Sequence, residues 1–146
     1  MWMVLVALIT ADVSNELLLQ TGHSLTLTDI AFATTHDWLA SAGADRRVLF
    51  WDPQSALTEH HYTHRDQSVS AMAWSKDDQR VALGTSNGDV TVLDFPALSP
   101  LIRLQPSQKG DWVTGLAFVG DRLVIATWEG VFAYDTSTWQ KVSVAP

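Results

Sequence analysis

The sequence predicts an all-β fold built from a repeated unit of four short strands, and three observations carry this prediction. Apolar runs of five to eight residues, rich in Val, Ile, Leu, Phe, Trp and Thr, alternate with polar turns along the chain. No segment of twelve or more residues shows helical periodicity. The same order of runs also returns after 42 and then 44 residues, which indicates internal repeats.

The opening run of the repeat fixes this spacing. It occurs as LTDIAFA (27–33), VSAMAWS (69–75) and VTGLAFV (113–119). Its aligned aromatic residues are Phe32, Trp74 and Phe118. Each opening run is followed by a second run, so a strand pair is expected at the start of every repeat.

The third run of each repeat ends in a bulky residue followed by aspartate. These pairs are Trp51-Asp52, Leu93-Asp94 and Tyr134-Asp135. Asn87-Gly88 lies between the second and third runs of the middle repeat, and Asn-Gly is a strong signal for a tight hairpin turn. A fourth apolar run then completes each repeat, so we expect four antiparallel strands per unit.

The pairs Gly22-His23 and Trp51-Asp52 bracket the first full repeat. Four short strands in about 40–45 residues, with these two pairs, resemble the WD40-repeat family of β-propellers. The resemblance covers residues 16–146 and is strongest in the first full repeat. It implies a WD40-like β-propeller, here a partial ring of four-stranded antiparallel blades.

The resemblance divides the chain into one propeller segment, residues 1–146, with four parts. These are an outer half-blade at 1–21 and three blades at 22–63, 64–106 and 107–146. Propellers typically close with about four to eight blades. We therefore expect the open ring to be completed by a second copy, as a homo-oligomer, or by further propeller blades of a longer protein.

The resemblance also implies a buried hydrogen-bond network in the first full repeat. In the family, a histidine before the first strand bonds a Ser or Thr on the second strand and an Asp in the next turn, and the Ser or Thr bonds the tryptophan. The matching residues are His23, Ser41, Asp45 and Trp51. Such a network satisfies the polar atoms of a buried imidazole and a buried indole.

The later repeats depart from this pattern. In the second, Leu83, Asn87 and Leu93 stand at the positions of the serine, aspartate and tryptophan. Arg65 takes the place of the histidine unless His64 shifts by one residue. In the third, the histidine is replaced by lysine and the tryptophan by tyrosine. These two blades are therefore expected to be held by apolar packing alone.

Two patterns in the sequence resemble chemical sites, and neither predicts an enzyme. The types of His23, Ser41 and Asp45 fit nucleophilic catalysis, but Ser41 falls inside a strand with no oxyanion-hole motif nearby. His60 and His64 would lie about 13 Å apart on a strand, too far for one metal ion. We expect no catalytic, metal or cofactor site.

Composition limits the partners. The chain has 146 residues, no cysteine and a net charge of −7, with nine Lys and Arg against sixteen Asp and Glu. The scattered charges form no basic face for nucleic acid or for an anionic membrane surface. The absence of cysteine favours an intracellular setting, and we expect a cytoplasmic protein.

In propellers, the loops between fourth and first strands and between second and third strands gather on one face. Because Trp and Arg dominate interface energetics, this face is the predicted site for a protein or peptide partner. The candidate contacts are Arg46, Arg65, Asp111, Trp112 and Trp128. The sequence thus predicts a non-catalytic interaction scaffold. The alternative is a propeller segment of a larger enzyme or signalling complex whose catalytic part lies on another chain or domain.

Overall fold

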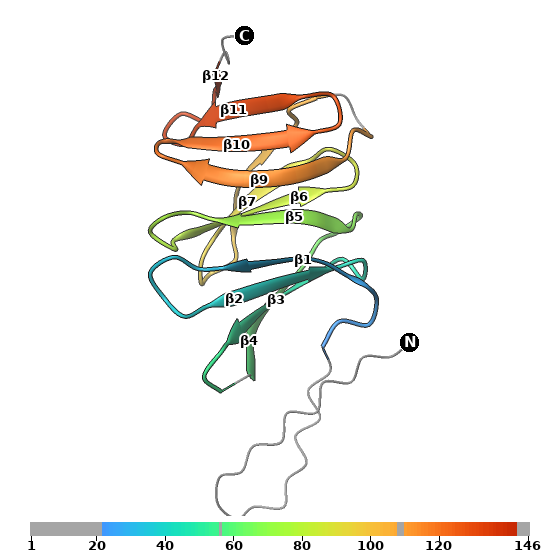
Figure 1. Cartoon of the computed structure of the whole chain (residues 1–146), viewed down its shortest axis with the longest axis vertical. Coiled ribbons are helices and arrows are strands. Elements are labelled where there is room, and N and C mark those ends of the chain that lie inside the picture. Colours follow the sequence, from blue (N-terminus) through green and yellow to red (C-terminus); the bar gives the residue numbers. More distant parts are fainter. Residues whose placement is uncertain (1–21, 56, 108–109, 143–146) are drawn as a thin grey trace, which may run out of the picture.

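The computed structural model describes residues 22–55, 57–107 and 110–142. The half-blade expected at residues 1–21 lies outside the described residues. Within them, twelve strands form three sheets (Figure 1). No helix in this part of the chain is long and apolar enough to cross a membrane.

Each sheet contains four strands that follow one another in the sequence, and we refer to the sheets as the first, second and third blades. The first blade contains β1 (Leu27–Phe32), β2 (Leu39–Gly43), β3 (Arg47–Asp52) and β4 (Leu57–Thr63). The second contains β5 (Val69–Trp74), β6 (Arg80–Thr85), β7 (Val90–Asp94) and β8 (Pro100–Leu104). The third contains β9 (Val113–Val119), β10 (Arg122–Thr127), β11 (Val131–Asp135) and β12 (Lys141–Val142).

Consecutive strands of a blade pair antiparallel, in the order in which they occur along the chain. The blades lie side by side, with β5 against β1 on one flank and β9 on the other (Figure 1). The prediction of an all-β fold made of four-stranded antiparallel blades is therefore confirmed. The Asn87-Gly88 turn also lies between β6 and β7 as predicted, and Gly88 supplies the positive φ of 87° that this turn uses.

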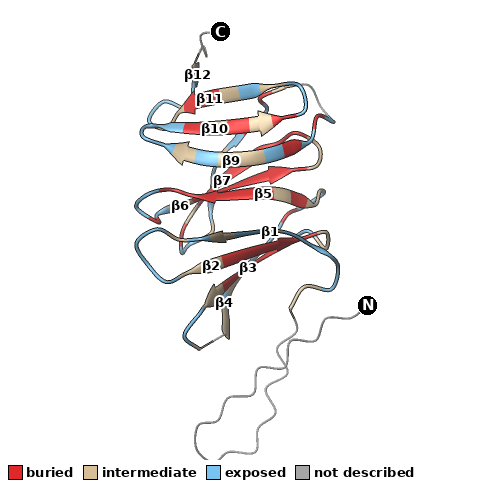
Figure 2. Ribbon diagram, viewed as in Figure 1, coloured by how far each residue is buried: buried red, intermediate tan, exposed pale blue. Residues whose placement is uncertain are grey.

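The apolar core lies between the blades, where Figure 2 shows the buried residues along the middle strands. Between the first and second blades, the rings of Phe50, Trp74 and Phe95 meet with centroids 4.8 to 5.8 Å apart. Phe50 comes from β3, whereas Trp74 ends β5 and Phe95 follows β7. This cluster therefore joins two blades whose contacting strands are far apart in the sequence.

A second apolar cluster joins the second and third blades. Its fully buried side chains include Val90, Val92, Val113, Leu123 and Ile125. The middle strands of the second blade are covered on both faces, which explains why β6 and β7 are nearly continuous apolar runs rather than alternating ones.

Hydrogen bonds to a buried carboxylate also link the first and second blades. Asp78, in the β5–β6 turn, accepts bonds from the backbone N–H groups of Thr34, Thr35 and His36 at 2.6, 2.7 and 2.8 Å. Its side chain is 2 % exposed. The expectation that apolar packing alone holds the second blade is wrong. The Asp78 carboxylate accepts hydrogen bonds from the backbone of a first-blade loop that lies more than forty residues away in the sequence.

Asp78→Asn should lower the free energy of unfolding by about 1–3 kcal/mol at neutral pH, since several donors lose a charged acceptor. Burial raises the pKa of Asp78, but the bonds from Thr35, Thr34 and His36 outweigh it and hold the pKa well below the ordinary 3.8. A lowered pKa in the folded state stabilises the protein above the unfolded-state value, and this stabilisation is lost as the pH falls. The difference between wild type and Asp78→Asn, measured by urea unfolding, should therefore shrink below about pH 4.

Asp121→Asn is the matched control, because Asp121 is exposed and the described residues donate hydrogen bonds only to its backbone carbonyl. This control should change stability little at any pH. An Asp78→Asn penalty that is equally large at pH 7 and at about pH 3 would contradict the assignment of this carboxylate.

Candidate functional site

The loops between the second and third strands of each blade, and between consecutive blades, lie along one edge of the molecule, at the right in Figure 1. We refer to this edge as the loop face. Its described loops are residues 22–26, 44–46, 64–68, 86–89, 105–107, 110–112 and 128–130. All the candidate contacts predicted from the sequence lie in these loops.

In the first blade, the structure brings His23, Ser41, Asp45 and Trp51 together behind the loop face. His23 Nδ1 lies 2.9 Å from Asp45 Oδ1, and His23 Nε2 lies 2.9 Å from Ser41 Oγ. Trp51 Nε1 donates to Ser41 Oγ at 2.8 Å. Because a carboxylate only accepts, the arrangement assigns a proton to Nδ1, and the Ser41 hydroxyl can then donate to Nε2.

The His23 and Asp45 side chains are each 4 % exposed, so they depend on one another for hydrogen bonds. Asp45 also accepts bonds from the N–H groups of Ser24 and Arg47 at 2.9 and 3.1 Å. Burial raises the pKa of Asp45, but the hydrogen bonds from His23, Ser24 and Arg47 lower it by more. The pKa therefore lies below its ordinary value. The carboxylate therefore fixes the loop before β1 to the β2–β3 turn.

Sequence reasoning missed the role of Gly43 in this network. A Cβ at Gly43 would lie 2.5 Å from His23 Nδ1 and 2.7 Å from Asp45 Oδ1. Only glycine leaves room for the histidine–aspartate pair at this position. The signal was present, since a glycine at the end of a strand often marks a close approach of another group.

In the third blade, the carboxylate that joins the loop to the turn belongs to the loop, whereas in the first blade it belongs to the turn. Asp111 lies in the loop before β9, and it accepts bonds from Trp128 N–H at 3.1 Å and from the Ser107 hydroxyl at 2.5 Å. Asp111 is 7 % exposed. The prediction of Asp111 as a partner contact is therefore corrected: its carboxylate is used within the chain to tie the loop before β9 to the β10–β11 turn.

In the second blade, the buried residue of the loop before β5 is His64, while Arg65 is exposed. His64 is 4 % exposed, and its Nδ1 accepts a bond from the N–H of Gln67 at 3.3 Å. Asp89, the last residue of the β6–β7 loop, is buried and accepts a 2.5 Å bond from Arg103. The second and third blades thus have polar networks of their own, contrary to the expectation of apolar packing alone.

Trp112 and Trp128 are the exposed aromatic residues of the loop face. Their rings stack with centroids 6.1 Å apart and an interplanar angle of 18°. Trp112 is 43 % exposed and Trp128 is 77 % exposed. Neither is buried between blades, so both rings are exposed on the loop face.

Arg46 and Arg65 form a separate group, at the junction of the first and second blades. Both are exposed, and the Arg46 guanidinium donates to the Arg65 carbonyl at 3.1 Å. The predicted contacts therefore do not form one cluster. They form an arginine pair at one junction and a tryptophan pair on the third blade, which the sequence could not separate because both occur in the same loop types.

Comparisons with known proteins agree with this architecture. Residues 15–52 match the sequence model of the WD domain, G-beta repeat family. The fold is similar to a solved structure of U3-55K, with a TM-score of 0.76 and 21 % identity, and to the RRP9 WD40 repeats, with 0.75 and 22 %. It is also similar to Sqt1 of Saccharomyces cerevisiae, with a TM-score of 0.73 and 19 % identity.

The first two matches cover 84 % of this chain and 39 % of the solved chains. The match to Sqt1 covers 83 % of this chain and 35 % of that one. The chain therefore spans less than half the length of these solved structures. At this level of identity, the similarity concerns the fold.

Truncating the network of the first blade tests its contribution to stability. Asp45→Ala or His23→Ala should lower the free energy of unfolding by about 1–3 kcal/mol, because each leaves a buried partner without its hydrogen bond. Glu59→Ala, which removes an exposed carboxylate on β4 of the same blade, is the control and should cost much less. Equal losses in Asp45→Ala and Glu59→Ala, measured by denaturant unfolding, would refute the assigned role.

Proposed function

We propose that this chain, whose fold is similar to that of WD40-repeat β-propellers, is a non-catalytic scaffold that binds protein partners through its loop face. Three blades packed side by side support the loops at one edge. Function on such a fold resides in the loops, since the strands are occupied with packing.

The stacked pair Trp112–Trp128 is the observation that carries this proposal. A tryptophan that is 77 % exposed contributes little to the folded chain, yet its apolar ring is in contact with water. The Asp111 carboxylate holds the backbone of Trp128 in place, so the ring pair is fixed before a partner arrives. Fixed aromatic residues bind with a small entropic cost, and this favours their use as anchors.

The buried position of Ser41 supports a non-catalytic role. Ser41 is 5 % exposed within β2, and its hydroxyl oxygen already accepts the Trp51 indole N–H. His23 and Asp45 are the residue types of a hydrolase triad, but here they lie behind the loops with no access for a substrate. Their arrangement suits a structural network.

A second candidate function is a propeller segment within a larger enzyme or signalling complex. The apolar side chains of Ile30 and Phe32, on β1, favour it. They are 56 % and 66 % exposed, and they alternate with Asp29 and Ala31, which contact the second blade. We propose that further blades or a second copy of the chain cover this side.

Light scattering on the isolated chain tests this association. A dimer, or a species that becomes stable only with a longer partner, is expected because exposed apolar sheet surface favours pairing. A monodisperse 16.1 kDa species at micromolar concentration would contradict it.

The cytoplasmic location stays a prediction.

The loop-face proposal is tested by comparing three forms of the full chain. The wild type, Trp112→Ala/Trp128→Ala and Val119→Ala are immobilised, and proteins retained from an extract of the source cells are compared. Val119 is 61 % exposed and ends β9 at the edge opposite the loop face, so it is a matched apolar control.

A partner that uses the tryptophan pair should be retained by the wild type and by Val119→Ala but lost by the double variant. With the purified partner, Trp128→Ala should raise the Kd about 30-fold, the scale of an interface anchor. Equal retention by all three forms would show that the tryptophan pair is not the binding site.

A further inference from the structure

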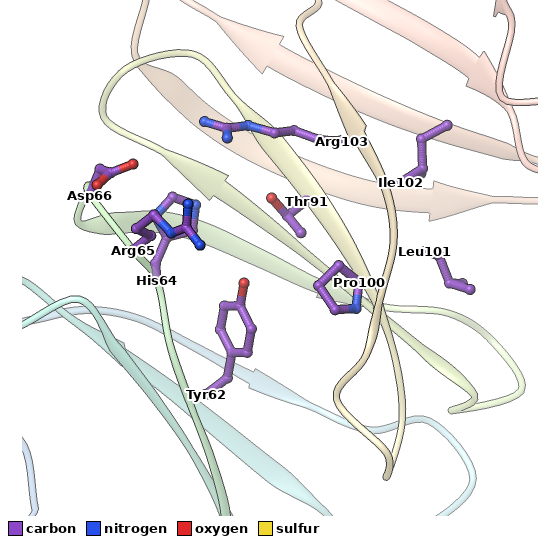
Figure 3. A pocket seen from close by; sticks show the side chains of 9 residues that line it. All are labelled: Tyr62, His64, Arg65, Asp66, Thr91, Pro100, Leu101, Ile102 and Arg103. Carbon is purple, nitrogen blue, oxygen red and sulfur yellow. The ribbon is translucent and has the colours of Figure 1, made fainter.

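A pocket opens between the first and second blades, beside the arginine pair of the loop face. Its volume is about 430 Å³, within the usual range for ligand pockets. It lies between the end of β4, the β4–β5 loop and the outer strand β8 (Figure 3). Its lining includes Tyr62, His64, Arg65, Thr91, Pro100 and Arg103.

Hydrogen-bond donors gather at one end of this pocket. His64 is 4 % exposed, and its Nδ1 accepts from Gln67 N–H, which leaves the proton of the neutral ring on Nε2. Burial lowers the pKa of His64, and the nearby charge of Arg103 lowers it further, so the neutral ring prevails at pH 7. Within the described part of the chain, Nε2 has no hydrogen-bond partner, although this side chain lines the pocket.

Tyr62 contributes a second donor to the same end. Figure 3 shows its hydroxyl directed toward the side of the pocket that holds His64 and Arg65. Burial raises the pKa of Tyr62 against the opposing charges of Arg103 and Arg65, so the hydroxyl keeps its proton at neutral pH. A protonated phenol can donate one hydrogen bond to a ligand oxygen.

Two arginines line the pocket although the chain as a whole is acidic. They are Arg65 and Arg103, and Arg46 lies beside Arg65 without lining the pocket. Arg103 is paired with Asp89, and Asp66 lies at the rim. Of the charged residues that line the pocket, two are arginines and one is an aspartate, and the guanidinium donors favour an anionic ligand over a cationic one.

The other end of the pocket is apolar and adjoins an unpaired strand edge. Pro100, Leu101 and Ile102 belong to β8, and Leu101 is 43 % exposed. In the second blade β8 pairs only with β7, so its outer edge has no strand beside it in the described sheet. An extended peptide can bind along such an edge by main-chain hydrogen bonds.

We propose that this pocket binds a short extended segment of a partner protein that places an Asp or Glu carboxylate at the donor end and an apolar side chain against β8. Arg65 and Arg103 supply the charge, and Tyr62 and His64 supply directed donors. The pocket adds a second contact to the proposed scaffold function, and it is distinct from the tryptophan pair on the third blade.

A titration of the ¹⁵N-labelled full chain with acetyl-Leu-Glu-Leu-amide tests this site, with acetyl-Leu-Gln-Leu-amide as the neutral isostere. The Glu peptide should give saturable shifts of the amides of Arg65, Thr91 and Arg103. It should bind about tenfold more tightly than the Gln peptide, because only the carboxylate forms charge-assisted bonds. Equal affinity for the two peptides, or shifts confined to other regions, would overturn the proposal.

Variants that keep the fold sharpen the test. Arg65→Gln should weaken the Glu peptide about tenfold and Tyr62→Phe about threefold, since each removes one donor from an exposed or half-buried position. Arg122→Gln, an exposed arginine on β10 of the third blade, should leave the affinity unchanged. Unchanged affinity in Arg65→Gln would refute the site.

The loop-face function and the pocket fail separately. The double variant Trp112→Ala/Trp128→Ala should abolish retention of the loop-face partner and leave binding of the Glu peptide unaltered. If the peptide does not bind while the tryptophan-dependent partner still does, the pocket proposal is wrong and the scaffold proposal stands.

Discussion

Packing of one blade against the next is the interaction on which the rest of this structure depends. A four-stranded sheet alone leaves both of its faces in contact with water, and burial of those faces on neighbours supplies most of the stabilisation. Phe50 of the first blade meets Trp74 and Phe95 of the second with ring centroids 5.8 and 5.2 Å apart. The loops, the polar networks and the pocket all take their positions from this contact.

Buried carboxylates add hydrogen bonds to the contacts that the apolar clusters make. They accept hydrogen bonds from loops that a sheet cannot satisfy by strand pairing. Asp45 and Asp111 perform the same task in opposite directions: Asp45 sits in the turn and binds the preceding loop, whereas Asp111 sits in the loop and binds the turn. Both blades thus join the loop before the first strand to the turn between the second and third strands, although the carboxylate comes from a different position in each.

The strands and their grouping could be predicted from the sequence because each apolar run pairs with its neighbour along the chain. LTDIAFA at 27–33, for example, corresponds to β1 at Leu27–Phe32. The residues of the first-blade network were likewise identified from a family resemblance. Those contacts lie within one repeat, so their spacing is visible in the sequence.

Contacts between blades could not be predicted in this way. Asp78 binds residues 42 to 44 positions away, and nothing in the local pattern of SKDDQ shows that its carboxylate faces another blade. The stacking of Trp112 on Trp128 depends on how two loops approach each other, and the pocket depends on where β8 lies beside the β4–β5 loop. Such features depend on how the blades pack. Sequence repeats predict that blades pack side by side, but they do not predict which side chains meet between them.

Native-state hydrogen exchange on Phe50→Leu tests the dependence of one blade on the next. This substitution removes ring contacts from the first blade and leaves the sequence of the second intact, and it should cost about 1–2 kcal/mol. Because the blades share one core, amide protection should fall by similar amounts in β3 of the first blade and in β6 of the second. A loss of protection confined to the first blade would contradict the account.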